Sequence, residues 1–529
     1  MSIPDTELSP DDFSRRSFIR RAGLLGAGAA TASVFGTATA AAAHGGGDDD
    51  GGDLRWLAGD HHIHTQYSSD AMFRVIDQAQ HAQAYGLDWI VITDHGGPQH
   101  ARIGVERVNP DILATRNALP DLLVFQGLEW NIPAAEHGTV FVAPGRNEVA
   151  VLKEFENTYD ASVVGAGPST PANEALAIAG INFLGQAVKR RRVDAALFLA
   201  NHPARRGLDS PHEFRGWRDA DPTVAVGMEG APGHQAASIP APQGPGSGRG
   251  FYAGSPTADS FPGFPPESYR TWGGFDFFTA TVGGLWDSLL AEGKPWWITA
   301  NSDAHSIYLD TAVRGPGSNF DVNGFYNDPV HGGVPNTGAG DFWPGLYSRT
   351  HVGAKADSYR AVMDGIRAGR VWVDHGGLIR GLDVRVDGTP LGGVHRVRRG
   401  TAVELTISVD LADKPNWAQF LPKLARVDVI RGAVTGVAAD KDTFTAPQTR
   451  VVKSFEVASG QRRVTFRYAL GRLDEPFYVR VRGTDGLRSQ PGFLGASVDP
   501  VGPQLDVLGN SDPWSDLWFY SNPIWIIPR

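Results

Sequence analysis

The chain contains no cysteine, and this absence limits both how it is stabilised and how it could bind a metal. Disulfide bonds are excluded, so stability must come from burial of a hydrophobic core. Thiolate ligands are excluded as well. Any metal ion must be held by imidazole and carboxylate groups, a ligand set that suits Zn, Mn or Fe.

An excess of positive charge is also missing, since 48 Lys and Arg face 58 Asp and Glu and the formal net charge is −10. The charge stays the same when residues 1–43 are removed, because four arginines there are balanced by four acidic residues. A general nucleic-acid binder would carry a basic face, so we expect no nucleic-acid partner. The basic run "KRRR" at 189–192 is interpreted as the solvated end of a helix, where cations meet the negative end of the helix dipole.

A strongly apolar run that could hold a helix in lipid is not evident near the N-terminus. The segment 22–43 is rich in Ala, Gly and Thr, which makes it too weakly apolar for a membrane anchor. It follows the pair Arg15 and Arg16 in "SRRSFIR" and ends in possible Ala-x-Ala cleavage sites, and so resembles a twin-arginine export signal. We therefore expect a signal peptide over 1–43, a flexible linker over 44–54, and a protein that the twin-arginine machinery exports to the periplasm or the medium without stable membrane insertion.

The length of 529 residues favours two domains. From 55 to 376, strand-like and helix-like segments alternate, which predicts a mainly parallel sheet of about seven strands in an α/β barrel. The predicted strands are 55–65, 88–94, 121–130, 139–144, 195–201, 224–230 and 295–303, and the predicted helices are 71–86, 181–192, 274–292 and 357–368. Two long segments rich in Gly, 231–272 and 306–350, are expected to form the walls of the barrel mouth.

From about 380 to 529 the apolar period changes to two, which predicts a smaller antiparallel β-sandwich. In "TAVELTISVD" (401–410), Val403, Leu405, Ile407 and Val409 are expected to face inward. The segments "KLARVDVIRG", "RRVTFRYAL" and "PFYVRVRGTDG" alternate in the same way. The tail "DPWSDLWFYSNPIWIIPR" is too aromatic for solvent and is expected to pack back on the domain interface.

Ionisable residues gather at the predicted strand ends, in "DHHIHT", "SSD", "TDHG", "GLEW", "EHG", "NHP" and "SDAH". His62 and His64 point to the same side of a strand, so this pair can chelate one ion. The other groups follow later strands, and in an α/β barrel the carboxyl ends of the strands meet at the rim where functional groups converge. His137 precedes its strand, so its place at that rim does not follow from the pattern.

These motifs, in this order, resemble the PHP (polymerase and histidinol phosphatase) metallophosphoesterases. The resemblance covers about 55–375 and implies a distorted seven-stranded barrel that binds two or three divalent ions (Zn, Mn or Fe). Carried over by motif, one ion is held by His62, His64, Glu129 and Asp303. Glu129 bridges to a second at His137 and His202, and a third is held by Asp70, His95 and His305. Ala71 departs from the family pattern, where a glycine often follows the aspartate, and His61 matches no ligand position.

The chemistry implied is hydrolysis of a small phosphorylated substrate, monoester or diester, by a metal-bound hydroxide. Glu129 and Asp303 are the expected catalytic ligands. Arg205, together with Arg206, could bind a phosphate group bidentately, although both could equally be surface residues. Asp94 could either orient an imidazole or cap its strand, and Glu229 could line the pocket.

Two other interpretations stay open at this point. An amidohydrolase also begins with His-x-His on a barrel strand, but it usually supplies a lysine as the bridging ligand, so Glu129 and "SDAH" favour the phosphoesterase. Alternatively, the sandwich could bind a surface polymer while the barrel is degenerate. A degenerate site should have lost ligands, and every position in the motif set is filled.

Overall fold

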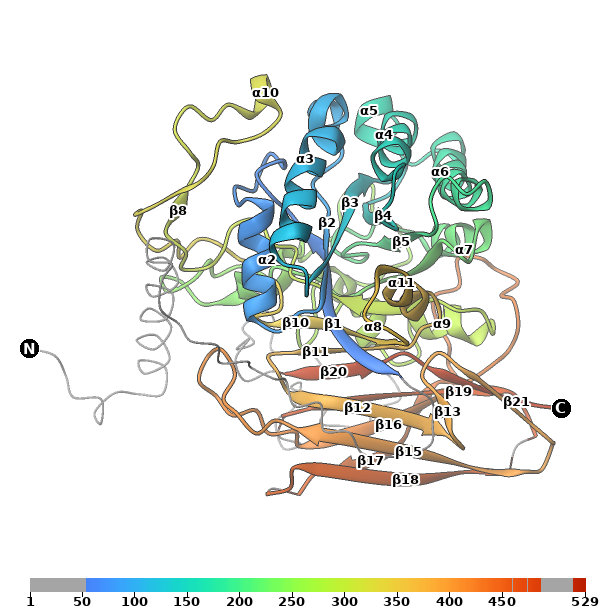
Figure 1. Ribbon diagram of the computed structural model, residues 1–529. Coiled ribbons are helices and arrows are strands. Elements are labelled where there is room, and N and C mark those ends of the chain that lie inside the picture. Colours follow the sequence, from blue (N-terminus) through green and yellow to red (C-terminus); the bar gives the residue numbers. More distant parts are fainter. Residues whose placement is uncertain (1–53, 459, 473, 487–516) are drawn as a thin grey trace, which may run out of the picture.

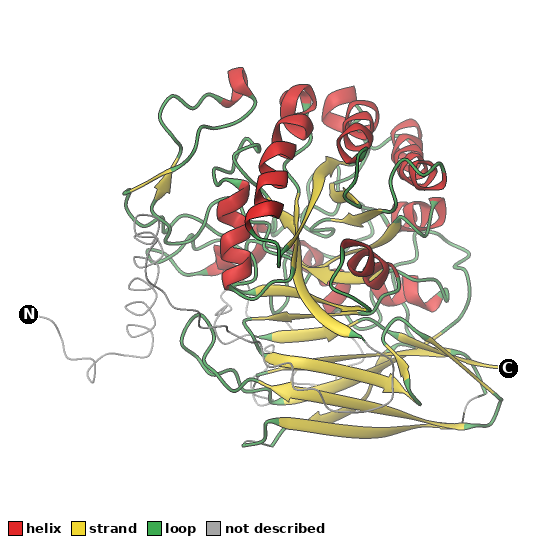
Figure 2. Cartoon of the chain, in the orientation of Figure 1, coloured by secondary structure: helices red, strands yellow, loops and turns green. Residues whose placement is uncertain are grey.

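The computed structural model describes residues 54–458, 460–472, 474–486 and 517–529. The predicted signal peptide and residues 44–53 of the predicted linker lie outside these ranges. An α/β part carries most of the helices, and layers of strands lie beneath it (Figures 1 and 2). Among the described residues, none of the helices combines the length and apolar character needed to span a membrane.

All of the strands predicted in the first part of the chain are present. They are β1 (Arg55–Ile63), β2 (Trp89–Ile92), β3 (Leu123–Asn131), β4 (His137–Val142), β5 (Ala196–Ala200), β6 (Ala225–Ala231) and β7 (Trp297–Ala300). They lie side by side in chain order. The pairs β1–β2–β3 and β5–β6–β7 are parallel, whereas β4 is antiparallel to both of its neighbours. The expected mainly parallel arrangement is therefore broken at β4.

A closed seven-stranded barrel is not confirmed. Strand β7 does not pair with β1, and the one described bridge to β1 joins Ile63 to Ala304, which lies beyond the end of β7. Away from that bridge, backbone N–H groups of β7 donate hydrogen bonds to side chains. The Thr350 hydroxyl accepts from Ala300 N at 2.8 Å, and the Asn522 amide oxygen accepts from Ile298 N at 2.9 Å. The free edge of β1 pairs instead with β10 (Ser348–Ala354). The sheet is thus drawn together at the carboxyl ends of β1 and β7 and opens at the other end.

Helices pack on the outside of this sheet (Figure 2). They are α2 (Val75–Ala84), α3 (Pro98–Ala118), α4 (Glu148–Tyr159), α5 (Ala161–Val164), α6 (Pro171–Lys189), α7 (Pro211–Ala220), α8 (Phe277–Ala280), α9 (Leu285–Ala291) and α11 (Tyr359–Arg367). The short helix α10 (Phe320–Asn323) stands apart from the sheet, on the long segment between β7 and β10 (Figure 1). The helix predicted over 181–192 begins earlier, because Thr170 caps it at its N-terminus. The helix predicted over 274–292 is divided into α8 and α9, since Gly283 has a left-handed φ of 79° that interrupts a helix.

The remaining strands form the lower layers and two small hairpin strands. They are β8 (Ala312–Val313), β9 (Val330–His331), β11 (Val371–His375), β12 (Ile379–Val386), β13 (Thr389–Pro390), β14 (Val394–Val397), β15 (Ala402–Leu411), β16 (Arg426–Ala433), β17 (Arg450–Glu456), β18 (Arg463–Arg472), β19 (Phe477–Thr484), β20 (Trp518–Ser521) and β21 (Ile524–Pro528). The predicted inward residues of β15 are buried, as expected from the period of two. In contrast, β19 is buried along its whole length, so its arginines lie inside the protein.

The aromatic tail explains why β19 is covered. Strand β20 pairs with β11 on one side and with β19 on the other. The described part of the tail, 517–529, therefore lies between the α/β part and the lower layer of strands, as predicted. Through β20 the main sheet continues into the lower layer, which includes β16, β17 and β19. A second sheet of order β13-β12-β15-β18 packs against that layer and shares a hydrophobic core with it (Figure 1). The expected sandwich is therefore not separate, because one of its layers is hydrogen-bonded to the α/β sheet.

Candidate metal centre

The structure brings all nine predicted metal ligands to one end of the sheet. His62 is the last-but-one residue of β1, and Glu129 lies near the end of β3. Five other ligands follow their strands by a few residues: His64, His95, His202, Asp303 and His305. His137 is the first residue of β4. Because β4 runs antiparallel to β3 and β5, its beginning lies at the same rim as their ends. The antiparallel strand thus accounts for the one ligand that the sequence pattern did not place.

The first group surrounds the two histidines of the His-x-His motif. The Nε2 atoms of His62 and His64 are 3.0 Å apart, and each lies 3.1 Å from Asp303 Oδ1. Glu129 Oε1 is 3.1 Å from His62 Nε2. Two ligands of one ion, each about 2.1 Å from it, lie about 3–3.5 Å apart, so these separations suit a shared ion.

Glu129 connects this first group to the histidines of the other two, which are His137 with His202 and His95 with His305. Its Oε1 atom lies 3.1 Å from His137 Nδ1 and 3.3 Å from His202 Nε2. Its Oε2 atom lies 2.7 Å from His95 Nδ1. A carboxylate with two oxygens shared among several imidazoles can bridge neighbouring cations and offset their mutual repulsion.

The third group lies at the more open side of the centre. His95 Nε2 is 3.2 Å from Asp70 Oδ2 and 3.3 Å from His305 Nε2. The side chain of Asp70 is 54% exposed, whereas those of His62, His64 and Glu129 are at most 1% exposed. Asp70 is therefore the most exposed of these ligands, and the His137 side chain is also partly open to solvent, at 25%.

Hydrogen bonds behind the histidines orient the Nε2 atoms toward the centre. His62 Nδ1 donates to Glu229 at 2.7 Å, and His64 Nδ1 donates to Ser68 at 2.9 Å, because the Ser68 hydroxyl itself donates to Asp94. In the neutral rings that metal binding requires, the facing Nε2 atoms carry only lone pairs. Glu129 Oε2 and Asp303 Oδ1 are likewise buried without a hydrogen-bond donor. A divalent cation satisfies all of these acceptors, so the residues fit a metal.

The electrostatics agree with this donor set. Burial alone would lower the pKa of His62, but the carboxylates of Asp303 and Glu129 outweigh it and raise that pKa well above its usual value. Burial would raise the pKa of Glu129, but the surrounding histidines, His62 first, hold it well below its usual range. The centre therefore stabilises positive charge where its ligand atoms converge.

Four residues support the centre without belonging to the predicted ligand set. Glu229 is buried behind His62 rather than lining a pocket, and its other oxygen accepts from His202 N at 2.6 Å. Asn201 donates to Glu129 Oε1 at 3.0 Å. His234 Nε2 lies 2.8 Å from Asp303 Oδ2, and its Nδ1 contacts Asp341. Asn201 begins the quoted motif "NHP" and Glu229 was a sequence candidate, but no pattern marked His234, which lies in a long irregular segment.

The structure also shows the contacts of the other residues singled out in the sequence. Asp94 accepts from Thr65 N at 2.6 Å and from Ser68, so it both caps the turn and orients His64 through the serine. His61 points away from the ligands and lies 2.8 Å from Thr299. Arg205 pairs with buried Glu136 at 3.3 Å, and its side chain is 21% exposed, whereas that of Arg206 is 47% exposed. Arg205 is thus the better placed of the two arginines to reach a bound anion.

Backbone strain is concentrated at the same rim. His202, His234, Phe251 and Asp303 have left-handed φ values of 31°, 54°, 52° and 48°. Such conformations are costly for residues other than glycine and cluster at functional sites. Gly233 allows the close approach of this segment, since a Cβ atom there would lie 2.2 Å from Asp303 Cβ.

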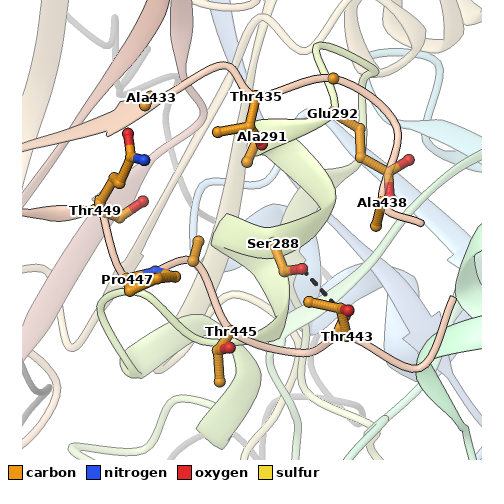
Figure 3. Close-up of a pocket in the computed structure, with 13 residues that line it drawn as sticks. Ser288, Ala291, Glu292, Ala433, Thr435, Ala438, Thr443, Thr445, Pro447 and Thr449 are labelled. Carbon is orange, nitrogen blue, oxygen red and sulfur yellow. Dashed lines mark hydrogen bonds between the residues drawn. The ribbon is translucent and has the colours of Figure 1, made fainter. Parts of the chain in front are cut away.

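A pocket elsewhere in the molecule lies between α9 and the 433–449 segment (Figure 3). Threonine, alanine and proline side chains make up most of its described lining, and its one ionisable residue, Glu292, is held by Arg215 and Arg218. It shares no residue with the metal centre.

The comparisons with known proteins bear on the first part of the chain. Residues 60–160 match the family model of the PHP domain. This PHP segment contains six of the nine ligands, from His62 to His137. No curated protein gives a significant match.

Similar solved structures share little sequence with this chain. One is a two-domain protein from Bacteroides vulgatus that contains a predicted PHP-like metal-dependent phosphoesterase, with 14% identity, a TM-score of 0.32 and coverage of 86% of this chain and 95% of the other. A proposed metal-dependent phosphoesterase from Bifidobacterium adolescentis has 16% identity, a TM-score of 0.21 and coverage of 33% and 77%. An endonuclease Q bound to a duplex with an abasic lesion has 18% identity, a TM-score of 0.21 and coverage of 35% and 46%.

Proposed function

We propose that this protein is a metal-dependent hydrolase of phosphoester bonds in small substrates. The observation that carries the proposal is the convergence of nine imidazole and carboxylate groups, with buried acceptors that a divalent cation satisfies, at one end of a sheet whose first part matches the PHP domain. We further propose that the centre holds two or three Zn, Mn or Fe ions. The acidic net charge disfavours long polyanions as substrates.

Each set of side chains has a part in this proposal. His62, His64, Glu129 and Asp303 hold one ion, His137 and His202 extend the site from Glu129, and Asp70, His95 and His305 complete it. Bound divalent ions supply Lewis acidity, which lowers the pKa of a water molecule and offsets charge growing on phosphoryl oxygens. Arg205, fixed by Glu136, binds a phosphate oxygen and orients the ester.

The decisive experiment compares the chain without residues 1–43 with its Asp303→Ala variant. We expect about two to three equivalents of metal in the parent protein and fewer in the variant, because Asp303 Oδ1 lies 3.1 Å from both His62 and His64. The metal-loaded parent should release p-nitrophenol from p-nitrophenyl phosphate or from its bis ester, and the choice between them separates a monoesterase from a diesterase. A fully loaded protein that cleaves neither ester, nor other phosphoesters, contradicts the substrate class.

His234 is proposed as a positioning residue for Asp303. Its Nε2 atom lies 2.8 Å from Asp303 Oδ2, so Oδ1 is left facing the ligands, while Asp341 contacts its other nitrogen and accepts from His305 N at 2.7 Å. We expect His234→Phe to weaken metal retention about 10–100-fold, measured by competition with a chelator. His234→Gln keeps a donor near the Nε2 position and should retain most of the affinity. Equal losses in both variants would argue against this role.

Export by the twin-arginine route is also proposed, on the basis of Arg15, Arg16 and the weakly apolar segment after them. Replacing both arginines by lysine should leave the precursor inside the cell. Fractionation of cells that express the two forms measures this, and unchanged release of the variant would count against the route.

A further inference from the structure

A short segment of the long 231–272 insertion runs between two parts of the proposed site. Gly250 N donates to His234 O at 3.1 Å, and Ala253 N donates to Arg205 O at 3.2 Å. One end of the segment is therefore tied to the residue that contacts Asp303, and the other end to the arginine proposed to bind phosphate. The residues between these two contacts, Phe251 and Tyr252, lie beside the metal centre.

Phe251 combines partial solvent exposure with a strained backbone conformation, which is unusual for a large apolar residue. The residue is 38% exposed, and its backbone has a left-handed φ of 52°, a conformation that favours glycine. Such a conformation is strained in a residue other than glycine, and part of the ring still faces solvent. Phe251 is also within the short 3₁₀ segment η4 (Arg249–Phe251), so the conformation is set by the local chain path.

The neighbours of Phe251 hold its ring at a fixed place. The ring packs edge-to-face against the His234 imidazole, with centroids 5.2 Å apart. A Cβ atom at Gly340 would lie 2.3 Å from Phe251 Cε2, so the bare backbone of this glycine is in contact with the ring. The next residue, Tyr252, is anchored through its hydroxyl to Asp276. These contacts fix one part of the ring and leave the rest open to solvent.

We propose that Phe251 determines substrate specificity by contacting the organic group of the phosphoester, and that this group is planar and apolar, such as an aromatic ring. This inference rests on the proposed function. The phosphate lies toward the metal ligands and Arg205, and the organic group extends over the Phe251 ring. An aromatic side chain in a fixed orientation favours a planar apolar group through stacking and burial of its surface. A ligand that covers the ring recovers the burial that the protein alone does not provide.

The test is a binding measurement that does not depend on turnover. Phenylphosphonate and methylphosphonate are titrated calorimetrically into the metal-loaded protein, into Phe251→Ala, and into Phe251→Tyr. We expect the parent protein to bind phenylphosphonate about tenfold more tightly than methylphosphonate. Phe251→Ala should lose this difference while it keeps its affinity for methylphosphonate, and Phe251→Tyr should retain it. Leu113→Ala, which truncates a side chain 44% exposed on the distant helix α3, is the control and should change neither affinity.

The outcomes separate the inference from the proposed function. Equal affinities of the parent protein for the two phosphonates overturn the inference without any variant being needed, and so does an undiminished preference in Phe251→Ala. A preference for phenylphosphonate that is lost in Phe251→Ala supports it, even if no phosphoester is hydrolysed, in which case only the proposed reaction fails. Matched turnover of benzyl phosphate and ethyl phosphate, whose alcohols are similar leaving groups, then shows whether the preference extends to the Michaelis constant.

Discussion

Replacing Glu129 by glutamine is expected to lower phosphoester hydrolysis by at least about 10³-fold and to release at least one equivalent of metal. Glu129 contacts His62, His95, His137 and His202 through its two oxygens, and its side chain is 1% exposed. Glutamine keeps the shape but removes the negative charge that offsets neighbouring cations. One of its two terminal atoms also becomes an amide nitrogen, whose N–H groups point at the histidine nitrogens that should bind the metal. Elemental analysis and steady-state kinetics measure the two effects.

The matched control is Glu148→Gln. Glu148 is also buried, at 4% exposure, and pairs with Arg116 at 2.9 Å between helices α4 and α3. This variant loses a buried charge in the same way but should keep its full metal content. If Glu129→Gln retained both metal and activity, the bridging role would be wrong.

Replacing Asp287 by asparagine is expected to lower the free energy of unfolding by about 3–5 kcal/mol. Asp287 lies on α9, and Arg480 of β19 binds both of its oxygens, at 2.9 and 2.7 Å, with both side chains fully buried. The Tyr478 hydroxyl also donates to it, at 2.8 Å. Asparagine removes the charge and leaves the arginine buried without its counterion. Urea denaturation of the metal-loaded protein, followed by circular dichroism, gives the change.

An exposed ion pair provides the comparison for this variant. Arg467 and Glu404 are 2.6 Å apart on the second sheet, but their side chains are 67% and 44% exposed. Glu404→Gln should change the free energy of unfolding by less than about 1 kcal/mol, since water and salt screen such pairs. A similarly small effect in Asp287→Asn would show that the buried pair does not hold the α/β part and the strands beneath it together.

The sequence anticipated the ligand set because metal chemistry restricts residue types strongly. Histidines and carboxylates recur at strand ends, and a strand alternates the direction of its side chains, so this alternation alone assigns His62 and His64 to one face. The nine residues lie together in the structure, and the two oxygens of Glu129 contact histidines of all three predicted groups. Whether each binds metal stays a prediction.

The supporting residues could not be found in this way. His234 approaches Asp303 because the left-handed turn at His234 and the small Gly233 bring an irregular segment against the sheet, and neither feature has a periodic pattern. Asp341 comes from another long segment and meets His234 only after both are folded. Phe251 is one of many phenylalanines in the sequence, and its exposure depends entirely on its neighbours.

The strands β1 to β7 and the imidazole and carboxylate groups available to a metal could be predicted from the sequence, which also excludes thiolates. Those properties depend on local pattern and composition. The folded structure was needed to show that β4 reverses and brings His137 to the rim, that β7 donates to Thr350 and Asn522 instead of pairing with β1, and that β20 joins the two regions. These features depend on hydrogen bonds between residues distant in sequence, and one-dimensional periodicity carries no information about which strands pair.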